Sequence, residues 1–242
     1  LTWREPVLYQ SQRLPVYADA VRGLVQAGLT FECFCTRREI QEAPSAPHAP
    51  PGAYPGTCRE LTEAQRAERR TERPAALRLR AHTTSFTVAD ELHGDYTGDV
   101  DDFVLVRGDG TPAYNLAVVV DDAAAGIDQV VRGDDLLSSA PRQAYLAQLL
   151  GVPVPRYAHV PMVLNSQHIR LSKRDGAITL EELADFGVSA GAVLNRLAVS
   201  LDLAEPGEPV TAADLLPRFD PKRIPRAPWL LSPTDFGDFT DI

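Results

Sequence analysis

The spacing of apolar residues along the chain predicts helices at its start and through its last third. In residues 13–28 apolar side chains recur every three to four positions, and Gly28 fits a C-terminal stop. Similar patterns predict helices over 62–72 and 138–150. Shorter helical segments are expected, in chain order, at 37–43, 180–186, 189–202 and 211–218.

The middle of the chain changes to the alternation and β-branched runs that are typical of strands. The segment 103–120 (FVLVRGDGTPAYNLAVVV) predicts a β-hairpin, because Asp109-Gly110 favours a turn with positive φ. Strands that alternate with helices, followed by helices alone, predict an α/β fold with a helical appendage. The strands are expected at 30–35, 76–81, 103–108, 112–122, 128–133 and 157–165.

Composition is that of a globular protein and indicates which segments lie outside the predicted elements. The 242 residues are 44% hydrophobic and 24% charged, as in ordinary globular proteins, and suffice for one sizeable core or two modest ones. Residues 43–56 (APSAPHAPPGAYPG) are expected to form an exposed loop, and the proline-rich tail from Asp220 to lie on the surface. No apolar run approaches the ~20 residues that span a bilayer, and no signal-peptide pattern begins the chain.

The net charge of −9 argues against a protein that binds nucleic acid through a broad basic surface. Any contact with RNA is therefore expected on a confined basic strip. One basic cluster is interleaved with glutamates, as in a solvated helix face, whereas a second is harder to explain in this way. The two clusters are Arg66, Arg69, Arg70, Arg73, Arg78 and Arg80, and then Arg170, Lys173 and Arg174.

Three cysteines are too few for a disulfide framework and indicate a reducing, cytoplasmic setting. Cys33 and Cys35 form a Cys-x-Cys pair, and Cys58 follows in YPGTC. A structural zinc needs a fourth ligand, and His48 offers the imidazole that zinc commonly binds. The alternative is three free thiols that pack as small hydrophobic groups.

The segment IRLSKRDGA (169–177) combines one lysine, two arginines and a glycine after a predicted strand. A mobile loop with compact cations can follow the charge that builds on phosphate oxygens in a transition state. The alternative is an ordinary basic surface loop.

The segment VVRGDDLLSS (130–139) places Arg132 where a predicted strand ends. Ligands gather at the C-terminal ends of strands in α/β proteins, so Arg132 is a candidate to clamp a carboxylate bidentately. The alternative is an arginine that is only paired with a nearby aspartate.

Five motifs in the same order resemble one family over residues 7–183. LSKRDGAITL resembles the KMSKS loop of class I aminoacyl-tRNA synthetases, in the form used by glutamyl-tRNA synthetases. The short C-terminal part and the cysteine pattern FECFC…YPGTC are most similar to the glutamyl-Q tRNA(Asp) synthetases, shortened paralogues that lack the anticodon-binding domain. The other four motifs are LYQSQR, YNLAVVVDD, VVRGDDLLSS and HVPMVLN.

The resemblance implies roles for individual residues. Tyr114 and Arg132 contact glutamate; without the family, Tyr114 would be interpreted as a buried hairpin aromatic. The lysine of the KMSKS-like loop is the catalytic, ATP-contacting residue. Asn115, Asp134 and Asp135 share these motifs, but helix capping and turn formation explain them. The implied loop is Arg170, Leu171, Ser172, Lys173 and Arg174, and the implied zinc ligands are Cys33, Cys35, Tyr54 (through a phenolate oxygen, with His48 as the alternative) and Cys58.

The implied activity is the ATP-dependent activation of glutamate and its transfer to the queuosine base in the anticodon loop of tRNA(Asp). Mg²⁺ accompanies the ATP, and a monomer without a membrane partner is expected. The family's HIGH motif is absent from the sequence and is expected upstream of Leu1. Two alternatives are a fragment of an ordinary glutamyl-tRNA synthetase and a non-catalytic, zinc-stabilised tRNA-binding remnant.

The resemblance also implies the domain organisation. The α/β fold is then the remainder of a Rossmann-like nucleotide-binding domain, with an inserted zinc-containing, acceptor-binding-like subdomain and a C-terminal helical stem-contact region. The expected boundaries are 1–29 for the end of the first Rossmann-like half, 30–110 for the zinc-containing insert, 111–165 for the second half, and 166–242 for the KMSKS-like loop and helical region.

Overall fold

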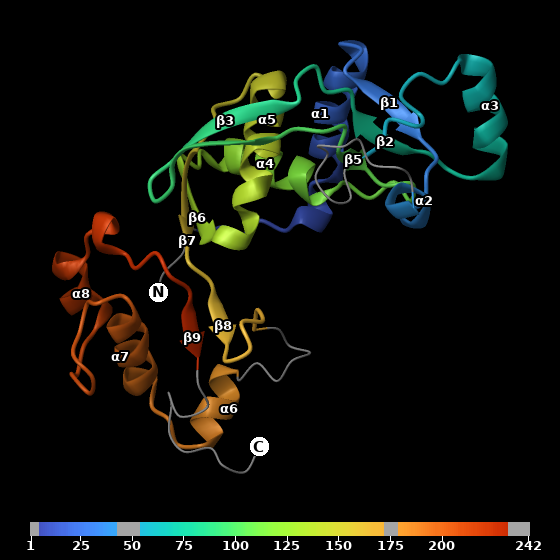
Figure 1. Cartoon of the computed structure of the whole chain (residues 1–242). Coiled ribbons are helices and arrows are strands. Elements are labelled where there is room, and N and C mark those ends of the chain that lie inside the picture. The colour runs from blue at the N-terminus through green and yellow to red at the C-terminus, as the bar shows by residue number, and fades with distance from the viewer. Residues whose placement is uncertain (1–4, 43–53, 172–178, 232–242) are drawn as a thin grey trace. The chain divides into compact units, whose positions relative to one another are not determined.

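The computed structural model describes residues 5–42, 54–171 and 179–231, and the chain divides into two compact units. The described residues form helices and three small sheets (Figure 1), which confirms the predicted α/β class. The finer division into four segments stays a prediction. The first unit comprises 1–89, 95–130 and 138–157, and the second comprises 90–94, 131–137 and 158–242.

Most predicted elements are present with slightly shorter bounds. The α-helices are α1 Leu14–Gln26, α2 Arg37–Glu42, α3 Glu63–Glu72, α4 Tyr114–Ala125, α5 Ala140–Leu150, α6 Leu180–Asp185, α7 Ala190–Ser200 and α8 Ala212–Leu215. The strands are β1 Thr30–Cys33, β2 Ala76–Leu79, β3 Ser85–Asp90, β4 Gly94–Asp99, β5 Val104–Val106, β6 Gln129–Gly133, β7 Arg156–Val160, β8 Val163–Asn165 and β9 Trp229–Leu231. Short 3₁₀ helices, η1 to η4, cover Gln10–Gln12, Asp134–Ser139, Leu216–Arg218 and Pro221–Arg223.

The three sheets differ in size and order. Strands β1, β2 and β5 form an antiparallel sheet in which Phe31 lies opposite Arg78. A second sheet has the order β4-β3-β7-β6, so β7 lies beside β3 although more than sixty residues separate them in the sequence. Strands β8 and β9 pair in parallel, with Val163 opposite Trp229. This last pairing gives the proline-rich tail a strand that the sequence did not predict.

The main core lies in the first unit, where α1, α4 and α5 pack beside one another (Figure 1). Each fully buried leucine of this core contributes about 1.5–3 kcal/mol relative to an exposed one. The completely or almost completely buried members are Tyr17, Leu24, Leu79, Leu105, Leu116 and Leu146. The core therefore joins segments from across the unit.

The predicted second strand of the hairpin is wrong, because residues 114–125 form the helix α4. The turn itself is correct: Gly110 has φ +81°, and its N–H donates to the Arg107 carbonyl. After a single bridge between Val106 and Pro112 the chain enters the helix. The three consecutive valines suit a strand equally well, but Leu116 and Val119 bury one helical face, and Gly126 ends the helix in a left-handed conformation.

The predicted strand over 157–165 is two strands instead of one. β7 ends at Val160 and β8 begins at Val163, with Pro161 between them. Proline has no N–H to donate to a sheet, so pairing stops there. Two further strands, β3 and β4, were not predicted. No helix among the described residues is long and apolar enough to cross a membrane.

Candidate functional site

The three cysteine sulfurs meet in a small cluster of the first unit. Cys33 ends β1, Cys35 lies in the turn before α2, and Cys58 lies in a turn of its own. Thr36 and Glu39 fix the start of α2 by exchanging hydrogen bonds, 2.6 Å from the Thr36 N–H to the carboxylate and 3.2 Å from the Glu39 N–H to the hydroxyl. The three sulfurs all lie within 4.8 Å of one another, so they form a group that can hold a metal ion.

The Tyr54 hydroxyl oxygen lies in the same cluster. It accepts a hydrogen bond from the Cys58 N–H at 2.7 Å and lies 3.4 Å from Cys33 Sγ. His48, the alternative fourth ligand, lies outside the described residues. Among the described residues, the structure thus brings all four ligands implied by the resemblance together.

Two distances in this cluster match tetrahedral zinc. Bonds of about 2.3 Å to sulfur and about 2.0 Å to oxygen separate two sulfur ligands by about 3.8 Å, and a sulfur from an oxygen by about 3.5 Å. Cys35 Sγ lies 3.6 Å from Cys58 Sγ, and the Cys33–Tyr54 distance is 3.4 Å. The residues present therefore fit the metal in chemistry and in spacing.

Burial raises the pKa of two groups in this cluster, Cys35 and Tyr54. It raises the pKa of Cys35 to about 12, with Cys33 and Cys58 adding to the shift, and raises the pKa of Tyr54 well above its usual value. Burial also acts to raise the pKa of Cys33, but hydrogen bonds from Tyr54, the Cys35 N–H and Arg78 outweigh it and lower that pKa. A bound cation inverts this pattern, because it favours the deprotonated ligand.

Arg78 supplies positive charge beside the cluster. This side chain is only 7% exposed, and its Cζ lies 3.8 Å from the centre of the Tyr54 ring. Its Nη1 donates to the Asp102 carbonyl at 2.8 Å. The prediction of a solvated helix face with interleaved glutamates is confirmed for Arg66, Arg70 and Arg73, which pair with glutamates. It is wrong for Arg78, which is buried.

Arg132 lies in the second unit, near the end of β6, and is half-buried. Its Nε donates to His159 Nε2 at 2.9 Å, and its Nη2 lies 3.4 Å from the Leu136 carbonyl. Asp135, three residues further along the chain, accepts from Arg170 Nη1 at 2.6 Å.

His159 is completely buried in β7 and joins Arg132 to Asp90 at the end of β3. The His159 Nδ1 to Asp90 Oδ2 distance is 2.6 Å. Burial lowers the pKa of His159, and Arg132 and His93 add to this, although Asp90 opposes it. Burial acts to raise the pKa of Asp90, but His159 and the N–H groups of His93 and Leu92 outweigh it and lower that pKa.

A tight turn leads from β8 to the KMSKS-like loop. The Asn165 side chain accepts from the N–H groups of Gln167 and Ile169, both at 2.9 Å, and Leu164 bridges to Arg170. The ion pair between Arg170 and Asp135 links the start of this loop to the RGDD segment. Leu171 is the last described residue before the gap, and Ser172, Lys173 and Arg174 lie outside the described residues.

Tyr114 begins α4 in the first unit and is 57% exposed, so the alternative of a buried hairpin aromatic is wrong. The next residue, Asn115, accepts from the buried Gln143 side chain at 2.9 Å, which is a contact between helices and not a cap. Tyr114 belongs to the first unit and Arg132 to the second.

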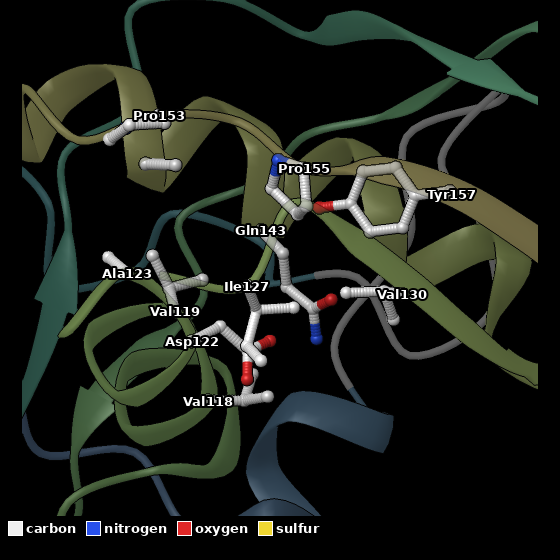
Figure 2. Close-up of a pocket in the computed structure, with 11 residues that line it drawn as sticks. Val118, Val119, Asp122, Ala123, Ile127, Val130, Gln143, Pro153, Pro155 and Tyr157 are labelled. Carbon is white, nitrogen blue, oxygen red and sulfur yellow. The ribbon is translucent and has the colours of Figure 1, made fainter. Parts of the chain in front are cut away.

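A pocket between α4, α5 and β6 in the first unit holds no space for a substrate (Figure 2). Its volume of about 20 Å³ suits about one water molecule. Asp122, Gln143 and Tyr157 are the polar members of a lining that is otherwise Val, Ala, Ile and Pro. We assign this pocket to packing.

Sequence reasoning missed Asp90 and His159. The available signals were weak: His159 interrupts the apolar run YAHVPMV, and Asp90 follows the alternating strand SFTVA. Neither residue lies in a motif with the other, since they are 69 positions apart.

Comparison with known proteins shows the family of the chain. The family model described as the catalytic domain of class I tRNA synthetases (E and Q) matches residues 1–216. A glutamyl-Q tRNA(Asp) synthetase of Nocardia farcinica is 62% identical over 98% of this chain and 75% of its own length. One of Cutibacterium acnes is 53% identical over 86% of this chain and 59% of its own length.

Full-length glutamate–tRNA ligases are more distant relatives. That of Geobacter sulfurreducens is 37% identical over 96% of this chain, which spans 50% of that protein. Among solved structures, a glutamate tRNA ligase from Elizabethkingia meningosepticum matches with a TM-score of 0.75 at 22% identity, over 96% of this chain and 53% of that one. This structural likeness shows the fold.

Proposed function

Because the chain belongs to the family of class I tRNA synthetases (E and Q), we propose that its site activates glutamate with ATP. Activation joins the glutamate α-carboxylate to the AMP portion of ATP and releases pyrophosphate. The glutamyl group then passes from the adenylate to RNA, and AMP leaves. This chain covers 75% of one relative and about half of the ligases, so the proposal concerns the full-length protein.

The observation that carries the proposal is that a hydrogen bond to His159 fixes the guanidinium of Arg132. Arginine presents a planar fork that matches a carboxylate, and this one stands at a strand end with its Nε bonded to His159. Glutamate offers such a carboxylate on its side chain. Tyr114, exposed at the start of α4, is proposed as a second glutamate contact.

Lys173 is proposed as the catalytic contact to ATP. Its ammonium acts as a point charge on phosphate oxygens, where negative charge grows as pyrophosphate leaves. Arg170, Leu171, Ser172 and Arg174 complete the proposed ATP-binding loop, and Mg²⁺ would accompany the phosphates as a hard cation. The pairing of Arg170 with Asp135 supports a defined start for this loop.

Zinc is proposed as a structural metal held by Cys33, Cys35, Tyr54 and Cys58. A closed set of four protein ligands leaves no open position, which is the pattern of structural zinc sites. The match between the cluster distances and tetrahedral zinc supports this assignment. The ion would fasten the segment around Cys58 to β1.

The proposed acceptor is the queuosine base of tRNA(Asp). Two relatives with the name glutamyl-Q tRNA(Asp) synthetase, at 62% and 53% identity, support this choice over the 3′ end of tRNA(Glu). The 37% identity to glutamate–tRNA ligases favours the second candidate, aminoacylation of tRNA(Glu). Transfer assays with the two tRNAs separate these candidates.

The first test is glutamate-dependent exchange between pyrophosphate and ATP in the full-length protein. We expect exchange without any tRNA and no exchange when aspartate replaces glutamate. Absence of exchange in zinc-loaded, folded protein would instead favour the non-catalytic tRNA-binding alternative.

A further inference from the structure

Two buried side chains fix the arginine that is proposed to receive glutamate. His159 is 0% exposed and Asp90 is 5% exposed, and both belong to the second unit with Arg132. The chain of contacts runs from Asp90 Oδ2 to His159 Nδ1 at 2.6 Å and from His159 Nε2 to Arg132 Nε at 2.9 Å. Each step joins residues that are far apart in the sequence.

The direction of each hydrogen bond follows from the chemistry of the groups. A guanidinium has only donors, so Arg132 Nε donates and His159 Nε2 accepts. A neutral imidazole has one donor and one acceptor, so Nδ1 carries the proton and donates to Asp90. An ionised carboxylate can only accept. The geometry therefore selects one tautomer of His159.

Backbone groups hold Asp90 independently of the imidazole. Its Oδ1 accepts from the N–H groups of Leu92 and His93, both at 2.9 Å, and its Oδ2 accepts from the His159 N–H at 3.2 Å. Both oxygens are thus committed as acceptors, and the carboxylate cannot rotate without losing a bond. The fixed carboxylate therefore sets the orientation of the His159 ring.

A neutral imidazole bonded to Arg132 Nε adds no negative charge beside the guanidinium. The imidazole orients the guanidinium through Nε without neutralising it. Orientation before binding reduces the ordering that binding would otherwise cost.

We propose that Asp90 and His159 are positioning residues that orient Arg132 for the side-chain carboxylate of glutamate. The inference rests on the proposed function, since it assumes that Arg132 receives glutamate. It predicts a specific defect when the relay, the chain of hydrogen bonds from Asp90 through His159 to Arg132, is broken: weaker glutamate binding with ATP binding intact. A purely structural role for the buried pair predicts lost stability without that selectivity.

Asp90→Asn tests the tautomer. The asparagine oxygen is needed by the N–H groups of Leu92 and His93, so its NH₂ faces His159 Nδ1. The imidazole must then accept at Nδ1 and carry its proton on Nε2, opposite Arg132. We expect ¹⁵N NMR of labelled full-length protein to show the protonated nitrogen of His159 change from Nδ1 to Nε2. An unchanged tautomer in the folded variant would overturn the relay.

Kinetics test the consequence. Asp90→Asn should raise the glutamate KM about tenfold or more, as expected for the loss of a hydrogen bond to a charged group, with the KM for ATP and kcat nearly unchanged. Asp101→Asn is the matched control, because it removes a carboxylate from another arginine pair, with Arg142 at 2.6 Å. Its glutamate KM should stay at the wild-type value.

A second pair of variants covers the case in which Asp90→Asn fails to fold. His159→Gln keeps an acceptor near the Nε2 position, whereas His159→Leu removes it at similar size. We expect a clearly lower glutamate KM for His159→Gln than for His159→Leu. Equal glutamate KM values for the two would contradict the proposal.

Arg132→Ala separates failure of the relay from failure of the proposed function. If this variant leaves the glutamate KM unchanged, the function assigned to Arg132 is wrong. If it raises that KM while Asp90→Asn and His159→Leu do not, only the relay is wrong. If both are correct, adding Asp90→Asn to Arg132→Ala changes the glutamate KM no further.

Discussion

Two cationic side chains, Arg132 and Lys173, are proposed to act on different parts of the reaction. Arg132 is expected to act on the amino acid, in the ground state and transition state alike, and Lys173 on the phosphates as pyrophosphate leaves. Their loss should therefore have different kinetic signatures.

Lys173→Ala should lower the rate of glutamate-dependent exchange about a hundredfold or more, since removal of one preformed transition-state contact costs about 3–4 kcal/mol. The glutamate KM should barely change. Lys222→Ala is a control, because this lysine lies in the 3₁₀ helix Pro221–Arg223, outside the proposed site. An unchanged exchange rate in Lys173→Ala would contradict the assignment of the loop to ATP.

Tyr54→Phe should weaken zinc binding, because it removes the ligand oxygen but keeps the ring that packs against Arg78 and Phe31. We expect one zinc per wild-type chain, faster loss of zinc to a chelator in Tyr54→Phe, and recovery of zinc binding in Tyr54→His, since imidazole is a common zinc ligand.

Cys35→Ser should lose zinc and increase hydrogen exchange in β1 and around Cys58. Zinc loss in His48→Ala but not in Tyr54→Phe would identify His48 as the fourth ligand.

Acid should destabilise the fold through His159. The folded-state pKa is lowered, so below about pH 6.5 the unfolded chain binds a proton that the folded chain does not, and the free energy of unfolding falls as the pH drops. Asp90, whose pKa is also lowered, loses its contribution only as the pH falls further, through its folded-state pKa. Arg132 and His93 are the neighbouring groups that oppose the imidazolium.

His159→Gln cannot bind this proton. Its loss of unfolding free energy between about pH 7.5 and about pH 5, measured by urea denaturation, should be smaller than that of the wild type. An equal loss would show that other groups cause the acid sensitivity.

Sequence reasoning at the residue scale found groups that lie in short motifs and missed groups that tertiary structure pairs. The Cys-x-Cys spacing of Cys33 and Cys35 indicates a joint site, and Arg132 stands out at the end of a strand pattern, before Gly-Asp-Asp. The Asp90–His159 contact joins strands that are neighbours only in the sheet order β4-β3-β7-β6. No local pattern encodes such a pairing.

At the scale of elements, periodicity succeeded where one pattern clearly dominates. Helix α5 has Pro141 in its first turn and Gly151, at φ +68°, after its last residue, as the sequence predicts. Helix α4 was assigned to a strand, because Val118, Val119 and Val120 fit both structures and only burial against α1 and α5 decides. Strand β4 (GDYTGD) was missed because it has only one apolar residue.

Two glycines in these elements should respond oppositely to alanine. Gly23 lies on the exposed side of α1, and a Cβ there meets nothing within 4 Å, so Gly23→Ala should raise the free energy of unfolding by about 0.5–1 kcal/mol. At Gly98 in β4 a Cβ would lie 2.8 Å from Pro141 Cγ and 2.9 Å from Tyr96, so Gly98→Ala should lower it by about 1–3 kcal/mol. Urea denaturation measures both. Equal effects at the two positions would contradict the described packing.

At the scale of the whole molecule, the net charge of −9 limits how the chain can meet an RNA. Non-specific attraction to phosphate is weak for an acidic protein, so recognition must come from a few local contacts. In α3, Arg66 and Arg70 are already paired with Glu32 or Glu63. We therefore expect a chemical feature of the acceptor, the queuosine base, to decide transfer more than overall charge does.

The transfer of radiolabelled glutamate tests this claim most directly. Full-length protein is incubated with ATP, Mg²⁺ and labelled glutamate, together with tRNA(Asp) that carries queuosine, tRNA(Asp) that lacks it, or tRNA(Glu). We expect label only on the queuosine-containing tRNA(Asp), and none after Arg132→Ala at a glutamate concentration near the wild-type KM. Label on tRNA(Glu), or equal labelling of the two forms of tRNA(Asp), would contradict it.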